Sequence, residues 1–326
     1  MNEPLIQRTP YMAQWNVSYQ RQFAKDWLAS VSYLGNKTTH VWLANDLNHV
    51  VYMPGTCGTA ACSTTANTNQ RRLLYLASPK DGQYFSGLFS TDDGGNANYN
   101  GVLTSVQHRF SRGFTVLANY TWSHCLNYGD INGNIGTGYY QDDIHRYPEY
   151  GSCAYDIRHM VNITGVAISP VKGNTFAGRL LGNWKLAPLI RATTGLAINV
   201  TTGKDNSLTA IGRDRPNQVL ADPYPAAQSP TQWINPAAFV PNPTGSFGTL
   251  GRNAFRAPGT LRVDAALSRE FAVTERLRLE ARGEGFNVIN HANFSAPSTN
   301  FSSANFGRIT SAGDPRILQF ALKVHF

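Results

Sequence analysis

The sequence contains no run of roughly eighteen apolar residues, and this absence excludes a transmembrane helix. It is also poor in charge, because charged residues make up only 15% of the 326 residues, against about a quarter in soluble domains. Strands of a membrane barrel carry a much weaker hydropathy signal than membrane helices, so neither shortage excludes a barrel. The surface must therefore be built largely from uncharged groups.

Helical periodicity, a secretory signal and a sequence repeat are also missing. Apolar residues recur at a spacing of two, and glycine interrupts most candidate windows, so few helices are expected. The opening MNEPLIQRTP has neither the basic start nor the apolar core of a signal peptide. An exported protein would need a leader upstream, so we expect a fragment or an N-terminally truncated product. The lack of a fixed repeat argues against a propeller or a solenoid.

The net charge of +8 is not concentrated in a basic run. Lysine and arginine are scattered and often alternate with acids, which does not fit a nucleic-acid-binding surface. We therefore expect no nucleic acid among the partners.

What the sequence does contain is amphipathic strands, and the clearest is the terminal RILQFALKVHF. Its apolar residues occupy every second position, and mostly polar residues fill the gaps. The alternating apolar residues are Leu318, Phe320, Leu322, Val324 and Phe326. A strand of about ten residues with an apolar outer face is long enough to cross a bilayer in an outer-membrane barrel.

The same alternation recurs along the chain as pairs of strands. Predicted pairs are 11–19 with 27–33, 99–110 with 113–122, and 160–169 with 184–192. Segments rich in glycine, asparagine, proline and threonine separate them, at 49–98, 127–152 and 203–259. Long loops thus alternate with short turns, as expected when one end of a barrel faces outward. The prediction is an all-β chain, residues 1–326 forming a single portion of a transmembrane antiparallel β-barrel, with about ten strands, long extracellular loops and short periplasmic turns.

The stretch 261–285 adds a charged face to this pattern. Five charged residues alternate with Leu277, Leu279, Ala281, Gly283 and Gly285. The charged residues are Arg276, Arg278, Glu280, Arg282 and Glu284. Such a face needs water or mutual pairing, and a wide barrel would supply both, so we predict that these residues line the lumen. The alternative is the solvated face of a soluble sandwich, which periodicity alone does not separate from a lumen.

Four cysteines lie in or beside polar loops: Cys57, Cys62, Cys125 and Cys153. An even count in such segments favours two disulfides in an oxidising compartment, with the pairing left open. A metal site would need a second ligand pair to match Cys57 and Cys62, and none is present.

No catalytic, cofactor or metal site is predicted. Asp156 and His159 lie together at a loop-to-strand junction, where a charge pair and a turn cap are the simpler interpretation. The loop GSFGTLG at 245–251 lacks the flanking strand and helix of a phosphate-binding loop. The acidic clusters at 92–93 and 142–143 lack the ligand spacing of a calcium loop.

Several long motifs resemble one family of outer-membrane proteins. They are NYNGVLTSVQHRFSRGFTVLANYTWSHCLN (98–127), AYDIRHMVNITG (154–165), WINPAAFVPNPTGSFGTLGRNAFRAPG (233–259), RLEARGEGFNVINHANF (278–294) and RILQFALKVHF (316–326). Together they make nearly the whole chain similar to the C-terminal part of Oar-like TonB-dependent outer-membrane proteins.

This resemblance implies a barrel of the Gram-negative outer membrane, closed around an N-terminal plug that engages a TonB-type energy transducer. It also implies that Phe320, Leu322, Val324 and Phe326 form the signal read by the barrel-assembly machinery. The plug and the carboxypeptidase-regulatory-like domain have no counterpart in these residues, so active transport is not expected of this chain alone. Barrels of this kind have about 22 strands, which makes roughly half a wall with two open edges the expected structure.

Two other functional classes fit parts of the sequence. One is a secreted or surface all-β adhesion module that binds through its Tyr/Asn/Gly-rich loops. The other, less favoured, is a soluble β-rich hydrolase that uses Asp156 and His159.

Overall fold

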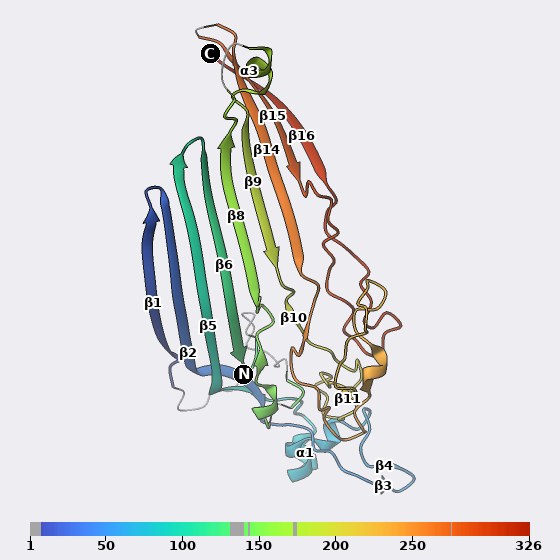
Figure 1. The fold of residues 1–326 in the computed structure, drawn as a ribbon. Coiled ribbons are helices and arrows are strands. Elements are labelled where there is room, and N and C mark those ends of the chain that lie inside the picture. The colour runs from blue at the N-terminus through green and yellow to red at the C-terminus, as the bar shows by residue number, and fades with distance from the viewer. Residues whose placement is uncertain (1–7, 131–139, 143, 172–174, 275) are drawn as a thin grey trace.

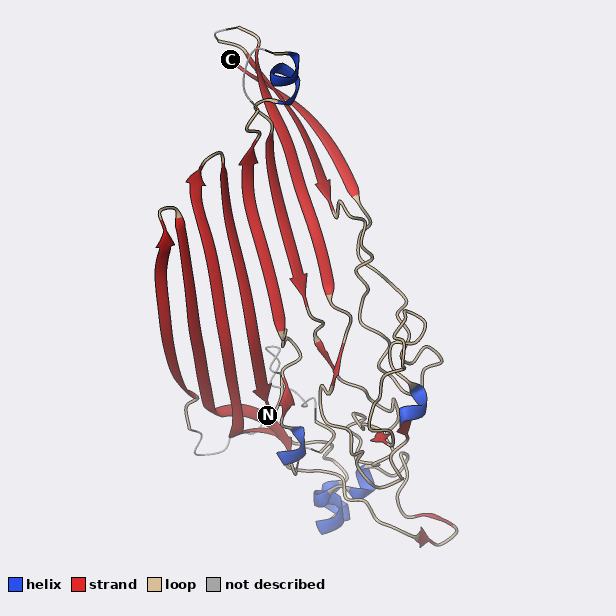
Figure 2. Ribbon diagram, viewed as in Figure 1, coloured by secondary structure: helices blue, strands red, loops and turns tan. Residues whose placement is uncertain are grey.

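Nine long strands of the computed structural model form one antiparallel sheet, and residues 8–130, 140–142, 144–171, 175–274 and 276–326 are described (Figures 1 and 2). The strands are β1 (Tyr11–Ala24), β2 (Trp27–Asp46), β5 (Phe89–Ser111), β6 (Phe114–Asn127), β8 (His159–Ile168), β9 (Lys185–Thr193), β14 (Thr260–Ala272), β15 (Arg278–Phe286) and β16 (Ile317–His325). They lie side by side in this order, and the short β7 (Gly151–Ser152) pairs with the end of β6 as the tenth strand. The prediction of an all-β antiparallel sheet of about ten strands is confirmed.

The remaining elements are short. Six are two-residue strands: β3 (Thr56–Cys57), β4 (Ala60–Ala61), β10 (Ala197–Ile198), β11 (Asn217–Gln218), β12 (Phe239–Val240) and β13 (Phe255–Arg256). The helices are α1 (Leu73–Ala77), α2 (Pro79–Gly82) and α3 (Phe176–Leu181), with 3-10 turns η1 (Asn69–Arg71), η2 (Tyr147–Glu149) and η3 (Pro236–Ala238). Among the described residues, no helix has the length and apolar character needed to span a membrane.

Turn chemistry explains how the long hairpins close. Between β5 and β6, Ser111 pairs with Phe114, which leaves Arg112 and Gly113 as a two-residue turn. Both turn residues have positive φ angles, 51° and 88°, and this conformation matches the right-handed twist of the flanking strands. The glycine adopts that angle without steric cost.

Long and short connections separate to opposite ends of the sheet (Figure 1). The short connections follow β1, β5, β8 and β14, and we call their side the turn end. The connections after β2, β6, β9 and β15 span 47–88, 128–158, 194–259 and 287–316, and we call their side the loop end. Within the second of these loops, residues 131–139 and 143 are outside the description.

One predicted loop boundary is wrong. Residues 89–98 were expected to belong to the first long loop, yet they form the beginning of β5. Their partner is the end of β2, with Thr91 opposite Ala44 and Asp92 opposite Leu43. Because the ladder to a neighbouring strand stabilises this stretch, its glycine- and asparagine-rich composition misled the local interpretation.

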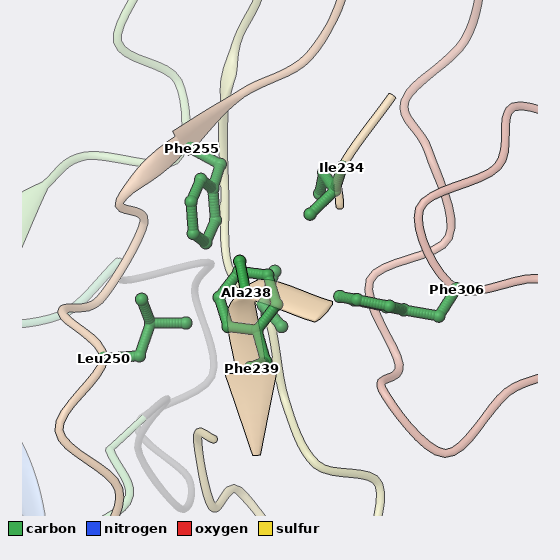
Figure 3. Packing of buried hydrophobic residues seen from close by; sticks show 7 residues of the cluster. Ile234, Ala238, Phe239, Leu250, Phe255 and Phe306 are labelled. Carbon is green, nitrogen blue, oxygen red and sulfur yellow. The ribbon is translucent and has the colours of Figure 1, made fainter. Parts of the chain in front are cut away.

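The hydrophobic core lies in the loops rather than in the sheet. Phe239, Phe255 and Phe306 pack edge to face at centroid distances of 5.5 and 5.8 Å around Phe239 (Figure 3). The other buried members of this cluster are Val200, Ile234, Ala238 and Leu250. The loop residues 194–259 and 287–316 therefore fold together as one packed layer at the loop end of the sheet.

The sheet is open, with β1 and β16 as its edges. Both edge strands run from the loop end to the turn end. Direction alternates from strand to strand, so the first and the last of nine strands run the same way. They are therefore parallel to each other and cannot pair in the antiparallel manner of the rest of the sheet.

Candidate functional site

The candidate site is the polar face of the sheet, whose charged part lies on the strands nearest the C-terminus. The register places Glu270 of β14 opposite Glu280 of β15, and Lys323 of β16 on the other side of Glu280. The same register places Ser268 and Ala321 on either side of Arg282. Since cross-strand partners point to the same side, the alternation predicted within single strands extends across the sheet.

Ion pairs balance part of this charge. Arg282 donates through Nε to Oε1 of Glu284 at 2.7 Å, and Gln319 donates to Oε2 of Glu284 at 3.2 Å. His325 lies 3.5 Å from Glu280, and Arg278 lies 3.8 Å from Glu270. These pairs are partly open to solvent, where one pair contributes only about 0–1 kcal/mol, so their effect is to keep the face wet and close to neutral.

Four of the five predicted lumen residues lie together on β15, and Arg276 does not. Arg276 precedes β15, in the connection from β14, because the strand begins at Arg278. It lines a cavity of about 590 Å³ at the turn end together with Glu270, Arg278, His325 and Phe326. The sequence alternation includes Arg276 because nothing in the side-chain pattern marks the residue at which strand pairing begins.

Charge is distributed unevenly over the polar face. The residues that β1, β2, β5, β6 and β8 contribute to it through paired positions include Gln20, Ser30, Ser105, Asn119 and Asn162, which are uncharged. In this row the first charged residue is Arg191 of β9, which pairs with Asn162 on one side and with Arg262 of β14 on the other. Amides and hydroxyls bind polar solutes through directed hydrogen bonds, whereas the charged half adds electrostatic selection.

The opposite face of the sheet is apolar and exposed. On β16, Phe320 is 84% exposed, and Leu318, Leu322 and Val324 are exposed beside it. The Phe320 ring lies 3.4 Å from the position of a Cβ at Gly283 of β15, so the aromatic ring covers a strand glycine. Phe326 follows the strand and is 98% exposed.

Aromatic side chains mark both ends of this apolar face. At the turn end, His108 stacks on Phe114 at 4.1 Å and contacts Trp27 at 4.6 Å. At the loop end, Tyr120 bonds His159 through its hydroxyl at 2.9 Å. Phe114 and Tyr120 are six residues apart on β6, about 20 Å along the strand, so both levels fall within the roughly 25 Å of an apolar barrel band.

Buried ion pairs join the long loops at the loop end. Arg215 forms two hydrogen bonds with Glu149, at 2.6 and 3.0 Å, and their side chains are 1% and 0% exposed. Arg252 reaches Asp130 at 2.8 Å, and Arg256 pairs with Asp156. Burial lowers the pKa of Arg252, an effect that Asp130 and Glu149 oppose. These contacts were not predicted, since their partners lie up to 122 residues apart in the sequence.

The acidic and histidine residues considered for catalytic or metal sites take part in structural hydrogen bonds and ion pairs. Asp156 is buried, accepts the backbone N–H of Cys125 at 2.7 Å and pairs with Arg256, whereas His159 bonds Tyr120. Asp92 pairs with Arg146, and Asp142 caps the backbone of Ile144 and His145; Asp143 lies outside the described residues. In the described ranges, no group of three or more histidine, cysteine or acidic residues is arranged to hold a metal.

The four cysteines form two disulfides. Cys57 pairs with Cys62 across β3 and β4, and Cys125 of β6 pairs with Cys153. The second bridge fixes the end of the second long loop to the sheet, five residues before Arg158, whose carbonyl accepts the backbone N–H of Ser123.

This fold defines a class of protein: a curved wall of antiparallel strands with one apolar and one polar face, loops at one end and turns at the other. The chain belongs to the family described as outer membrane beta barrel domain, whose profile matches residues 3–319. It is a protein of the outer membrane of Gram-negative bacteria, and no curated protein sequence matches it.

Solved structures resemble the chain at low sequence identity. The outer membrane transporter YddB from Escherichia coli is 10% identical with a TM-score of 0.51, over 99% of this chain and 33% of that one. A chain of the FpvAI–pyocin S2 complex is 11% identical with a TM-score of 0.44, over 97% and 27%. The chain thus spans about a third of the length of the transporter whose fold it shares.

Proposed function

We propose that this chain forms part of the wall of an Oar-like, TonB-dependent outer-membrane transporter or receptor, without catalytic activity of its own. The supporting observation is that β14, β15 and β16 keep the same two-faced alternation in one continuous register, with the charged residues of β15 on the polar side. The polar face, with Arg278, Glu280, Arg282 and Glu284, lines the lumen, and Arg276 lies at its turn end. The apolar face contacts lipid.

The remaining partners follow from this assignment. The exposed Phe320, Leu322 and Val324, with Phe326 at the end of the chain, are the surface that we assign to the barrel-assembly machinery. A TonB-type energy transducer would act through a plug domain joined to this wall. The substrate then passes between the polar face and that plug, for uptake or for export.

A cysteine-labelling scan of β15 in outer-membrane vesicles tests the assignment of the faces. Single cysteines at Glu280, Arg282 and Glu284 should react with a charged, water-soluble thiol reagent, and cysteines at Leu279 and Ala281 should react only with a lipid-soluble one. The native cysteines form disulfides, so they do not contribute to the background. Gly285 is left out because a Cβ there would lie 2.4 Å from Val288.

Equal reaction of both parities with the water-soluble reagent would exclude the membrane-wall assignment. It would favour the other candidate, a surface-exposed adhesion module with water on both faces of the sheet. A parallel scan of β16 provides an internal control. Cysteines at Gln319 and Lys323 should react with the water-soluble reagent, and a cysteine at Leu322 should react only with the lipid-soluble one.

A further inference from the structure

Two arginines face each other at the loop end of the polar face. Arg191 of β9 is the cross-strand partner of Arg262, the third residue of β14. Directly opposed side chains in an antiparallel pair have Cβ atoms about 4.5–5.5 Å apart, and like charges in this position are destabilising. A negatively charged group beside the two arginines would relieve this repulsion.

The neighbouring side chains do not neutralise both arginines. The row that continues across the sheet from Arg191 is Asn162, Asn119, Ser105, Ser30 and Gln20, which contains no acid. Within the described residues, no acidic side chain lies within ion-pair distance of Arg191. Arg262 uses Nε for both oxygens of Asp264, at 3.0 and 2.9 Å, and Asp264 also accepts the backbone N–H of Asn287. Asp264 therefore serves the Arg262 guanidinium and a backbone amide, and it does not pair with Arg191.

Both arginines line a cavity of about 380 Å³ between the sheet and the last long loop. The ring of Phe286, whose centroid lies 5.9 Å from the Arg262 guanidinium, also lines it. The loop residues Asn287, Asn293 and Asp314 complete the lining with polar groups. This size falls within the range of small-molecule sites, and the mixture of one aromatic ring with a few polar groups is typical of them.

Hydrogen bonds fix the cavity wall to the sheet. Leu261 donates its backbone N–H to Asn293 Oδ1 at 2.7 Å, and Val288 donates to the carbonyl of Val263 at 2.7 Å. Asn287 further binds the carbonyls of His291 and Asp314 through its side-chain amide. The arginines therefore face a preformed wall, so little ordering is needed when a ligand binds.

We propose that Arg191 and Arg262 form a binding site for an anionic solute, which bridges the two guanidinium groups through carboxylate or phosphate oxygens. Planar guanidinium groups pair with such oxygens in two-pronged geometry. Asp314, the acid of the cavity wall, suits a ligand that also carries a hydroxyl or an amine. This inference rests on the proposed function, because the polar face must be the lumen.

Equilibrium dialysis of the full chain in detergent micelles tests the site with two probes, citrate for carboxylates and inorganic phosphate for phosphates. Saturable binding of at least one probe is expected, weakened about tenfold or more in Arg191→Gln and in Arg262→Gln. The matched control is Lys185→Gln, which removes one positive charge from the same face of β9 at its turn end. It should change affinity less than about twofold, because salt screens charges beyond roughly 10 Å. Circular dichroism checks that each variant keeps its β-structure.

Two outcomes would overturn the proposal: no saturable binding of either probe, or an equal loss of affinity in Lys185→Gln. Failure here with a confirmed labelling contrast on β15 leaves the membrane wall intact and removes only the anion site. Failure of the labelling contrast removes the proposed function itself.

Discussion

The sheet and the loop layer of this protein are stabilised in opposite ways. The loop layer has a packed core around Phe239 and Phe255 and fully buried ion pairs such as that of Arg215 with Glu149. The sheet exposes large apolar side chains on one face and partly open ion pairs on the other. The core residues of the loop layer are buried by other residues of the same chain, whereas the apolar face of the sheet is exposed and, on the proposed function, is covered by lipid.

The two regions differ because they fold in different surroundings. In the sheet, backbone ladders satisfy the polar main-chain groups, and the bilayer takes the place of a hydrophobic core. The loop layer lies outside the hydrocarbon and must bury its own apolar surface, so it resembles a small soluble domain. Removing an ion pair should therefore cost more stability in the loop layer than in the sheet.

The largest effect is expected from breaking a buried ion pair of the loop layer. Glu149→Ala leaves Arg215 buried without its carboxylate, which should destabilise the loop layer by about 3–5 kcal/mol. Hydrogen exchange followed by mass spectrometry should show faster exchange in peptides covering 141–152 and 248–256, with the long strands unchanged.

The control is Glu270→Ala in the sheet, whose partner Arg278 is 64% exposed. It removes an ion pair of the same chemistry but should cost less than about 1 kcal/mol. Equal protection losses in both variants would contradict the distinction between the two regions. A Glu149→Leu/Arg215→Met double variant should recover most of the loss, since apolar pairs of similar volume replace buried ion pairs without penalty.

A positive charge placed on either face of β16 tests whether the two faces of the sheet have different surroundings. Leu322→Arg puts a cation near the middle of the apolar face, where the cost is about 2–4 kcal/mol at the bilayer midplane. Ala321→Arg, on the polar face, should cost less than about 1 kcal/mol, because its side chain reaches water and the acids beside Arg282. Urea unfolding in lipid vesicles measures both, and a similar loss in the two variants would contradict the assignment of the faces.

The smallest effect concerns a tyrosine of the loop layer. Burial raises the pKa of Tyr140 from 10.0 to about 12. The unfolded chain then loses this proton at lower pH than the folded one, so stability falls as pH rises from 10 to 12, by about 2–3 kcal/mol at most. Ultraviolet titration should show one late-ionising tyrosine that is absent in Tyr140→Phe; a titration unchanged by that substitution would show that Tyr140 ionises with the others.

The strands were predictable because their signal is local. Alternation at a spacing of two gave the β1–β2 hairpin and the amphipathic β14, β15 and β16 directly. The signal failed at strand ends, as at 89–98 and Arg276, because pairing with a neighbour decides where a ladder starts and stops. The candidate charged face was found for the same reason that the strands were.

The contacts of the loop layer and the anion site had no such signal. Arg71 of the first loop donates to the carbonyl of Leu208, 137 residues away, and Arg252 reaches Asp130 across 122 residues. Arg191 and Arg262 lie on either side of the loop 194–259 in the sequence, and they meet only through the pairing of β9 with β14. No spacing rule connects partners that chain topology brings together.

Local sequence pattern is enough to identify this protein as a series of amphipathic strands with long polar connections, because side chains alternate between two faces of any strand regardless of its neighbours. The tertiary structure decided which strands are neighbours, that the connections pack into one layer with its own core, and which charges on the polar face are neutralised. Those properties depend on the register of strands far apart in the chain, and register is set by the collective pairing of the sheet rather than by any one stretch of sequence.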